Sequence, residues 1–214
     1  MMTNAEGKIV ITIGRQSGAN GLEIGKQLAA LFQIKYYDKS LLELAAKETG
    51  IDSRLFEKAD EKPSNKLLRA LVYNPVNMYD KSLMSRDELY ELQANVIREI
   101  ATRESCVIIG RTADYILRDR PNCFHFFIHA PFDKRVEHMM KQEGVTVQKA
   151  IHILNKVDKK RAHYYNYYTN KTWGASASYH LCIDSSFLGI EGTASFLKSF
   201  VERKLTALPS NEKL

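Results

Sequence analysis

A glycine-rich stretch near the N-terminus has the residue types and spacing of a turn that holds phosphate. In KIVITIGRQSGANGLEIGKQLAALF, an apolar run ends at Gly14, RQSGANG follows, and a helical pattern begins near Gly21 or Leu22. Small residues let the backbone approach a phosphate, and a helix N-terminus offers unpaired N–H groups with a partial positive charge. The residues expected to contact a bound polyphosphate are Gly14, Arg15, Ser17, Gly18, Ala19, Asn20, Gly21 and Leu22.

The usual phosphate-binding signature, G-x-x-x-x-G-K-[ST], is met only in part. Aligning the small residues of the two loops places Gly21 where the lysine belongs and Leu22 where the Ser or Thr belongs. Arg15 is the cation best placed to compensate, and Lys26 lies further along the helix. A strand–helix turn that binds no ligand remains the alternative interpretation.

Two further polar residues follow other apolar runs. Asp38 follows KYY and Arg111 follows SCVIIG. A guanidinium at a strand end presents a planar fork to phosphate oxygens, so Arg111 is expected to contact a phosphate group. The alternatives are a structural ion pair of Arg111, for example with Asp114, and a helix N-cap role for Asp38 at the start of residues 39–48.

A basic, tyrosine-rich segment follows in the second half of the chain. Asp158, Arg161, Tyr165 and Tyr168 are spaced by three, four and three residues, which places them on one face of a helix. Lys160 and Arg161 on a closing lid would neutralise phosphate charge. A solvated basic face is one alternative, and stacking on single-stranded nucleic acid is another.

These residues are positioned by alternating strands and helices. Continuous apolar runs predict strands over 8–14, 35–38, 105–110, 123–130 and 179–184, whereas helical spacing predicts helices over 21–32, 86–104 and the C-terminal region. This alternation predicts an α/β fold with a mostly parallel sheet, in which ligands bind beyond the carboxyl ends of the strands. The polar residues singled out above follow strands at that edge.

Composition limits the remaining possibilities. The chain has 214 residues, enough for one domain (1–214), and its net charge of +6 suits an anionic partner. Three cysteines and six histidines show neither disulfide nor metal-ligand spacing, so no metal site is expected. No signal peptide or membrane-spanning run is evident, which predicts a cytoplasmic protein without membrane association.

Two longer blocks resemble the nucleoside monophosphate kinases, and most closely cytidylate kinase. Gly110-Arg111-Thr112 is similar to the G-R-D element of that family, with Thr112 replacing Asp. Ile183-Asp184-Ser185-Ser186 and Leu188-Gly189-Ile190-Glu191 are similar to its C-terminal motifs. The degenerate loop and the YYNYYTNKTWG element are typical of the divergent cytidylate kinase-like branch.

The resemblance implies a three-layer P-loop kinase fold with five strands, an acceptor-binding insertion at about 39–104 and a lid at about 140–175. It also implies ATP and Mg²⁺ as cofactors and small nucleotides as substrates, with CMP or dCMP as the acceptor. The implied catalytic residues are Arg15, Asp158, Lys160 and Arg161, and the implied substrate-binding residues are Asp38 and Arg111.

Two other functions stay open. One is a nucleotide-binding regulator with weakened catalysis, because the loop lacks its lysine and its Ser or Thr. The other is a kinase of a different small metabolite, because residues 50–85 match the family weakly. Nucleic acid is not expected as a partner, and a homo-oligomer is compatible with the sequence.

Overall fold

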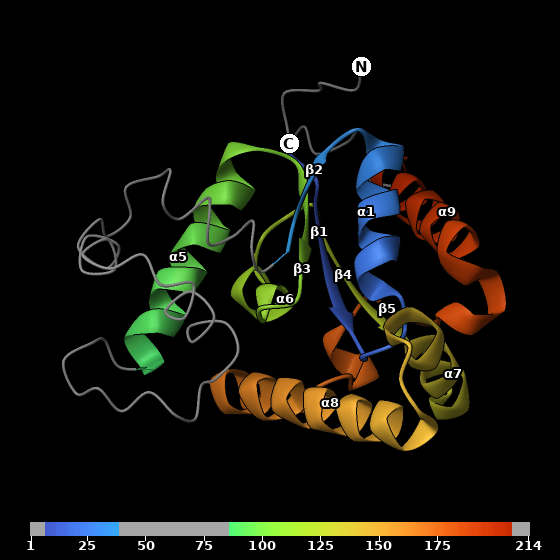
Figure 1. Cartoon of the computed structure of the whole chain (residues 1–214). Helices are drawn as coiled ribbons and strands as arrows, with labels where there is room; N and C mark the ends of the chain where they lie inside the picture. The colour runs from blue at the N-terminus through green and yellow to red at the C-terminus, as the bar shows by residue number, and fades with distance from the viewer. Residues whose placement is uncertain (1–6, 39–85, 207–214) are drawn as a thin grey trace, which may run out of the picture.

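The computed structural model describes residues 7–38 and 86–206 of the chain. Figure 1 labels the elements: β1 (Val10–Arg15), α1 (Gly21–Phe32), β2 (Lys35–Tyr37), α5 (Arg86–Arg103), β3 (Cys106–Ile109), α6 (Ala113–Ile116), β4 (Cys123–His129), α7 (Phe132–Glu143), α8 (Val147–Thr169), β5 (Leu181–Asp184) and α9 (Ser185–Thr206). All five predicted strands and the three predicted helical regions are confirmed. The expected helix at 39–48 and most of the expected insertion lie outside the described residues.

The five strands form one sheet in the order β2-β3-β1-β4-β5, and every pair of neighbours is parallel. The predicted α/β class is therefore confirmed, with a sheet that is wholly rather than mostly parallel. The first strand lies at the centre, with β3 on one side and β4 on the other. Its carboxyl end is consequently flanked by the ends of two strands from later in the chain.

Alternating side chains of the strands build two apolar cores, one on each face of the sheet. In β3, Cys106 and Ile108 pack on one face, whereas Val107 and Ile109 pack on the other. The helix α5 covers the first face through residues such as Ile97, while α1 and α9 cover the second. Coverage on both faces explains why the strands read as continuous apolar runs.

The helix α8 crosses the carboxyl ends of the strands instead of covering a face of the sheet (Figure 1). The preceding helix, α7, is capped at its C-terminus by Gly144 in the left-handed conformation (φ 63°). Thr146 then caps the N-terminus of α8, and its side chain accepts a hydrogen bond from the Lys149 amide. Two side chains of α7 and two of α8 form a small separate core: Val136, Met139, Ala150 and Leu154. The predicted lid region thus contains a long helix held next to the strand ends.

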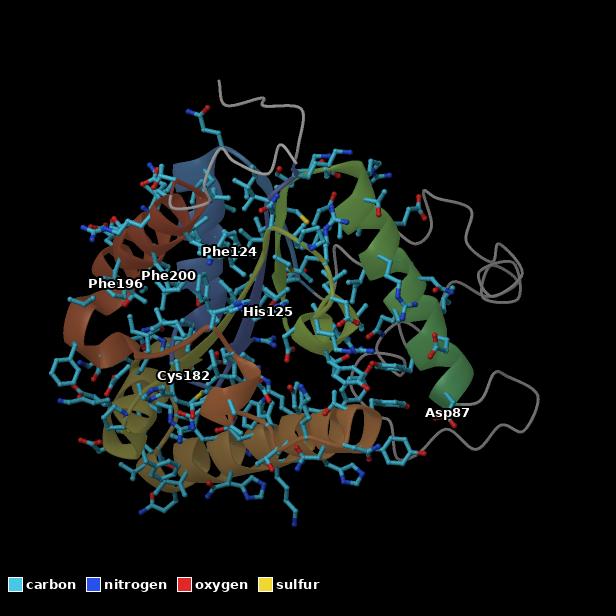
Figure 2. All side chains as sticks on the ribbon, turned by 180° about the vertical axis from the view of Figure 1, so that it is seen from behind. Asp87, Phe124, His125, Cys182, Phe196 and Phe200 are labelled. Atoms are coloured by element: carbon cyan, nitrogen blue, oxygen red, sulfur yellow. The ribbon has the colours of Figure 1, made fainter. Side chains whose placement is uncertain are left out.

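A polar network lies inside the sheet at His125, which Figure 2 labels in the interior. The Nδ1 atom of His125 lies 2.8 Å from the Thr12 hydroxyl, and the His125 amide donates to Nδ1 of His180 at 2.8 Å. The two imidazoles stack with centroids 5.0 Å apart. Burial, with smaller contributions from His180 and Lys171, lowers the pKa of His125 to about 4.

We expect this histidine to make the fold sensitive to acid. Between the ordinary histidine pKa of 6.5 and the folded value of about 4, the unfolded chain binds a proton that the folded chain excludes. The contribution of His125 to the free energy of unfolding is therefore fully present above pH 6.5 and is lost as the pH drops toward 4. Between pH 7.5 and pH 5 the free energy of unfolding is expected to fall by about 2 kcal/mol. Urea unfolding of the wild type and of His125→Gln, each at about pH 7.5 and about pH 5, measures this change in the free energy of unfolding. Equal pH dependence of the two proteins would contradict the assignment.

Candidate phosphate-binding site

The turn between β1 and α1 presents a row of backbone amides. Gly18 and Asn20 adopt left-handed conformations, with φ of 77° and 57°. The amides of Asn20, Gly21 and Leu22 donate to no acceptor within the described parts of the chain. These N–H groups lie at the positive end of the α1 dipole, so the turn offers a site for an anion.

The side chain of Arg15 occupies the space that a lysine at position 21 would need. A Cβ atom on Gly21 would overlap the Cβ of Arg15 and lie 2.8 Å from its Cγ. A Cβ atom on Gly110 would overlap Nη1 of the same arginine and lie 3.0 Å from its Cζ. Gly21 therefore leaves room for the base of the Arg15 side chain and Gly110 leaves room for its guanidinium, so a lysine at position 21 would overlap Arg15.

The guanidinium groups of Arg15, Arg161 and Arg111 lie close enough to interact at the turn. Burial and the charges of Arg161 and Arg111 lower the pKa of Arg15 to about 9, against the opposing effect of Asp38 and Asp158. Burial also lowers the pKa of Arg161. Arg15 still carries its charge at neutral pH, and it would be stabilised by a further anion. The structure thus brings together five predicted residues: Arg15, Asp38, Arg111, Asp158 and Arg161.

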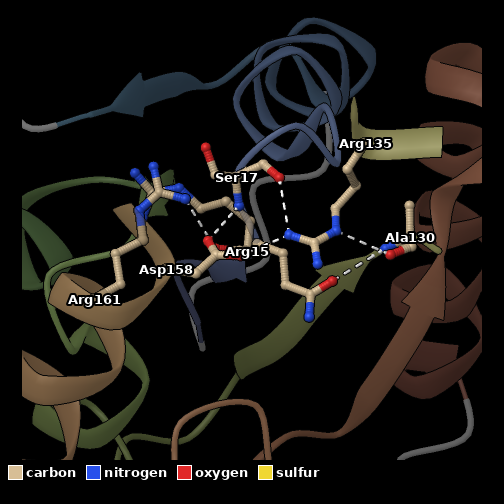
Figure 3. Close-up of polar contacts among 7 residues, drawn as sticks. Arg15, Ser17, Ala130, Arg135, Asp158 and Arg161 are labelled. Atoms are coloured by element: carbon tan, nitrogen blue, oxygen red, sulfur yellow. Dashed lines mark hydrogen bonds and ion pairs between the residues drawn. The ribbon is translucent and has the colours of Figure 1, made fainter. Parts of the chain in front are cut away.

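Side chains from α7 and α8 fasten the turn (Figure 3). Asp158 accepts a hydrogen bond from the Ser17 amide at 2.7 Å and pairs with Nη1 of Arg135 at 2.6 Å. Nη1 of Arg135 also donates to the Ser17 carbonyl at 3.3 Å, and Nε donates to the Ala130 carbonyl at 3.1 Å. Arg161 donates to the Arg15 carbonyl at 3.1 Å. The backbone at Ser17 is therefore held on both its amide and its carbonyl side.

The predicted shared face of α8 is confirmed. Asp158 and Arg161 contact the turn, while the Tyr165 hydroxyl donates to Asp114 at 2.8 Å. Tyr168 stacks on Tyr90 of α5 with centroids 4.0 Å apart and the ring planes within 2°. The tyrosines therefore connect α8 to the body of the domain.

The segment after β3 has an unusual backbone. Gly110, Arg111 and Thr112 all have positive φ, at 78°, 59° and 53°. Left-handed conformations of non-glycine residues cost free energy and occur often at functional sites. The Asp114 carboxylate bonds to Tyr165, and burial raises its pKa; it forms no ion pair with Arg111. The ion pair between Arg111 and Asp114, the example expected from the sequence, is therefore not found among the described residues.

The end of β5 also supports the turn. Ser185 donates to the Ala19 carbonyl at 2.9 Å, and Asp184 accepts hydrogen bonds from the amide and hydroxyl of Ser186 at 2.9 and 2.7 Å. Asp184 thus binds the first turn of α9, and Ser185 holds the phosphate turn at its Ala19 carbonyl.

Two predicted cations lie elsewhere. Lys160 is exposed on α8, two positions from Asp158 and so on a different face of the helix. Lys26 is exposed, with its ammonium 5.8 Å from the centroid of the Tyr36 ring. Sequence reasoning missed Arg135, which is only 7% exposed. Its position in the first turn of the helix after β4, at the same carboxyl edge, is the signal that would have identified it.

The described residues do not fit a protein-held Mg²⁺ site. Leu22 has no side-chain oxygen, and both carboxylate oxygens of Asp158 are engaged by Ser17 and Arg135. Within the described ranges, no group of three His, Cys, Asp or Glu side chains is placed to hold a metal ion.

Solved structures with the same fold include several kinases. An uncharacterized protein from Eubacterium ventriosum ATCC 27560 is 28% identical, with a TM-score of 0.70 over 91% of this chain and 99% of that one. A shikimate kinase from Bacteroides thetaiotaomicron is 16% identical (TM-score 0.51; 91% and 98% covered). A gluconokinase from Sinorhizobium meliloti 1021 is 13% identical (TM-score 0.51; 94% and 98% covered).

The arrangement of amides and guanidinium groups at the strand ends agrees with a P-loop kinase fold. No curated protein matches the sequence. None of the described helices is both long and apolar enough to span a bilayer. Residues 10–187 match the cytidylate kinase-like family, and they include both the phosphate turn and the Asp-Ser-Ser motif at the end of β5. The chain belongs to the cytidylate kinase-like family.

Proposed function

We propose that this protein transfers a phosphoryl group from ATP to a nucleoside monophosphate, with CMP or dCMP as the acceptor. The observation that carries the proposal is the turn after β1, where three successive amides have no acceptor among the described residues and the Arg15 side chain packs against Gly21. Phosphoryl transfer needs little covalent help from a protein, because positioning and charge neutralisation lower most of the barrier.

Each residue then has a physical role. The amides of Asn20, Gly21 and Leu22, together with Arg15, hold the donor phosphates. Arg161 neutralises charge that develops on the transferred group. At the neighbouring strand ends, Arg111 binds the acceptor phosphate, and Asp38 orients the acceptor. Lys160 contributes only if α8 changes its position when substrates bind.

The direct test measures ADP release, in the presence of Mg²⁺, against a panel of nucleoside monophosphates, shikimate and gluconate. We expect turnover with CMP or dCMP that exceeds turnover with the other acceptors. Activity confined to a compound that is not a nucleotide would replace the nucleotide acceptor and leave the phosphotransferase activity in place.

A second function, a nucleotide-binding regulator, is favoured by one observation. Leu22 replaces the side-chain oxygen that a P-loop normally supplies, and the described residues do not fit a protein-held Mg²⁺ site. Titration calorimetry that shows ATP binding, combined with no ADP release for any acceptor, would support this function over the kinase.

A further inference from the structure

We infer that Ser17 and Arg135 form an anion-binding subsite of the phosphate turn, and that the Asp158 carboxylate occupies it until a donor phosphate displaces it. The inference rests on the proposed function, since it concerns the same turn. It assigns a ligand role to Arg135 and an inhibitory role to Asp158. The ligand class is a polyphosphate, bound through oxygens of its terminal phosphate.

The geometry of the contact supports this assignment. One carboxylate oxygen accepts from the Ser17 amide at 2.7 Å, while the other faces Nη1 of Arg135 at 2.6 Å. Two donors that each engage a different oxygen of one anion form the pattern by which proteins bind carboxylate and phosphate alike. Figure 3 shows Asp158 reaching from α8 to the turn, next to Arg161.

The subsite is built rather than incidental. Ser17 and Arg135 are 8% and 7% exposed. The Arg135 guanidinium is held in place by the Ala130 carbonyl and lies 5.2 Å from the centroid of the Phe132 ring. Gly18 next to it has no room for a side chain, because a Cβ atom would lie 3.0 Å from the Arg135 carbonyl oxygen.

A carboxylate at this position opposes the proposed ligand. From α8, the Asp158 carboxylate contacts the Ser17 amide of the turn that leads into α1, so its charge repels a polyphosphate that enters there. The donor must therefore move Asp158 away from the Ser17 amide. Because Asp158 and Arg161 are three residues apart on α8, we expect this release to free α8 to shift together with Arg161. Occupancy of the turn is thereby coupled to the position of α8.

The test compares the wild type with Asp158→Asn and Asp158→Ala, using inorganic tripolyphosphate and ATP as probes in titration calorimetry. Loss of the competing charge is expected to tighten binding of both probes by about 10-fold. Glu143→Gln, which removes an exposed carboxylate at the end of α7, is the matched control and is expected to leave the affinity unchanged.

The amide resonance of Ser17 gives a second readout that is independent of affinity. Tripolyphosphate is expected to shift this resonance in the wild type, and Asp158→Ala is expected to shift it before any ligand is added. If a variant is less stable, the rise in melting temperature on adding tripolyphosphate still reports its binding.

The inference would be overturned if the folded variants bound both probes as weakly as the wild type, or more weakly. Asp158 would then only stabilise the turn and would not compete with the ligand. In that outcome the proposed function still stands, provided that the wild type binds triphosphate. Failure of the wild type and of both variants to bind triphosphate would overturn the proposed function and the subsite together.

Discussion

Replacing Arg15 with methionine is expected to lower kcat/KM for ATP-dependent phosphoryl transfer by about 100-fold to 1000-fold, the range seen when one charge-stabilising donor is removed from an active site. Methionine retains much of the volume that packs against Gly21 and Gly110, so the charge is the main difference. The base of the Arg15 side chain packs against Gly21 of the turn, and burial, followed by repulsion from Arg161 and Arg111, lowers the pKa of Arg15 to about 9. A bound polyphosphate would relieve that repulsion.

Two variants control this experiment. Lys26→Met removes the cation that lies along α1 and contacts Tyr36, so it is expected to retain activity. Arg15→Lys keeps the charge but loses the planar fork, and it is expected to recover only part of the rate. Steady-state ADP release with thermal melting of each protein provides the measurement. Full activity in a folded Arg15→Met variant would show that the turn does not use this guanidinium.

Restoring the usual lysine at position 21 is expected to damage the site. In Gly21→Lys, the new Cβ overlaps Arg15, so either the arginine or the start of α1 must move. We expect about 100-fold weaker triphosphate binding, and a loss of about 1–3 kcal/mol in stability that is typical of overpacking. Calorimetry with ATP and urea unfolding measure the two effects.

The double variant Arg15→Gly with Gly21→Lys tests the cause. Removing the arginine side chain makes room for the lysine, so the double variant is expected to bind triphosphate more tightly than Gly21→Lys alone. Neighbouring residues that share one space show such non-additive effects. If Gly21→Lys by itself binds more tightly than the wild type, the arginine and the lysine do not compete for the same space.

Local patterns were sufficient for much of the fold. The apolar runs that become β1, β3 and β4 are covered on both faces, so they could be recognised without their partners. The spacing of Asp158, Arg161 and Tyr165 was sufficient to place them on one face of α8, because a helix repeats every 3.6 residues. The phosphate turn was recognisable because glycine and a following helix are local requirements.

The sequence by itself therefore determined the alternating elements, the strand-end location of the site and most of its candidate residues. Only the tertiary structure decided that Asp158 binds the Ser17 amide, 141 positions away in the sequence, and pairs with Arg135 there. It also decided that Gly110, which directly follows β3, makes room for the Arg15 guanidinium at the end of β1. Such contacts depend on which strands become neighbours and how helices pack on them, and no local periodicity encodes that order.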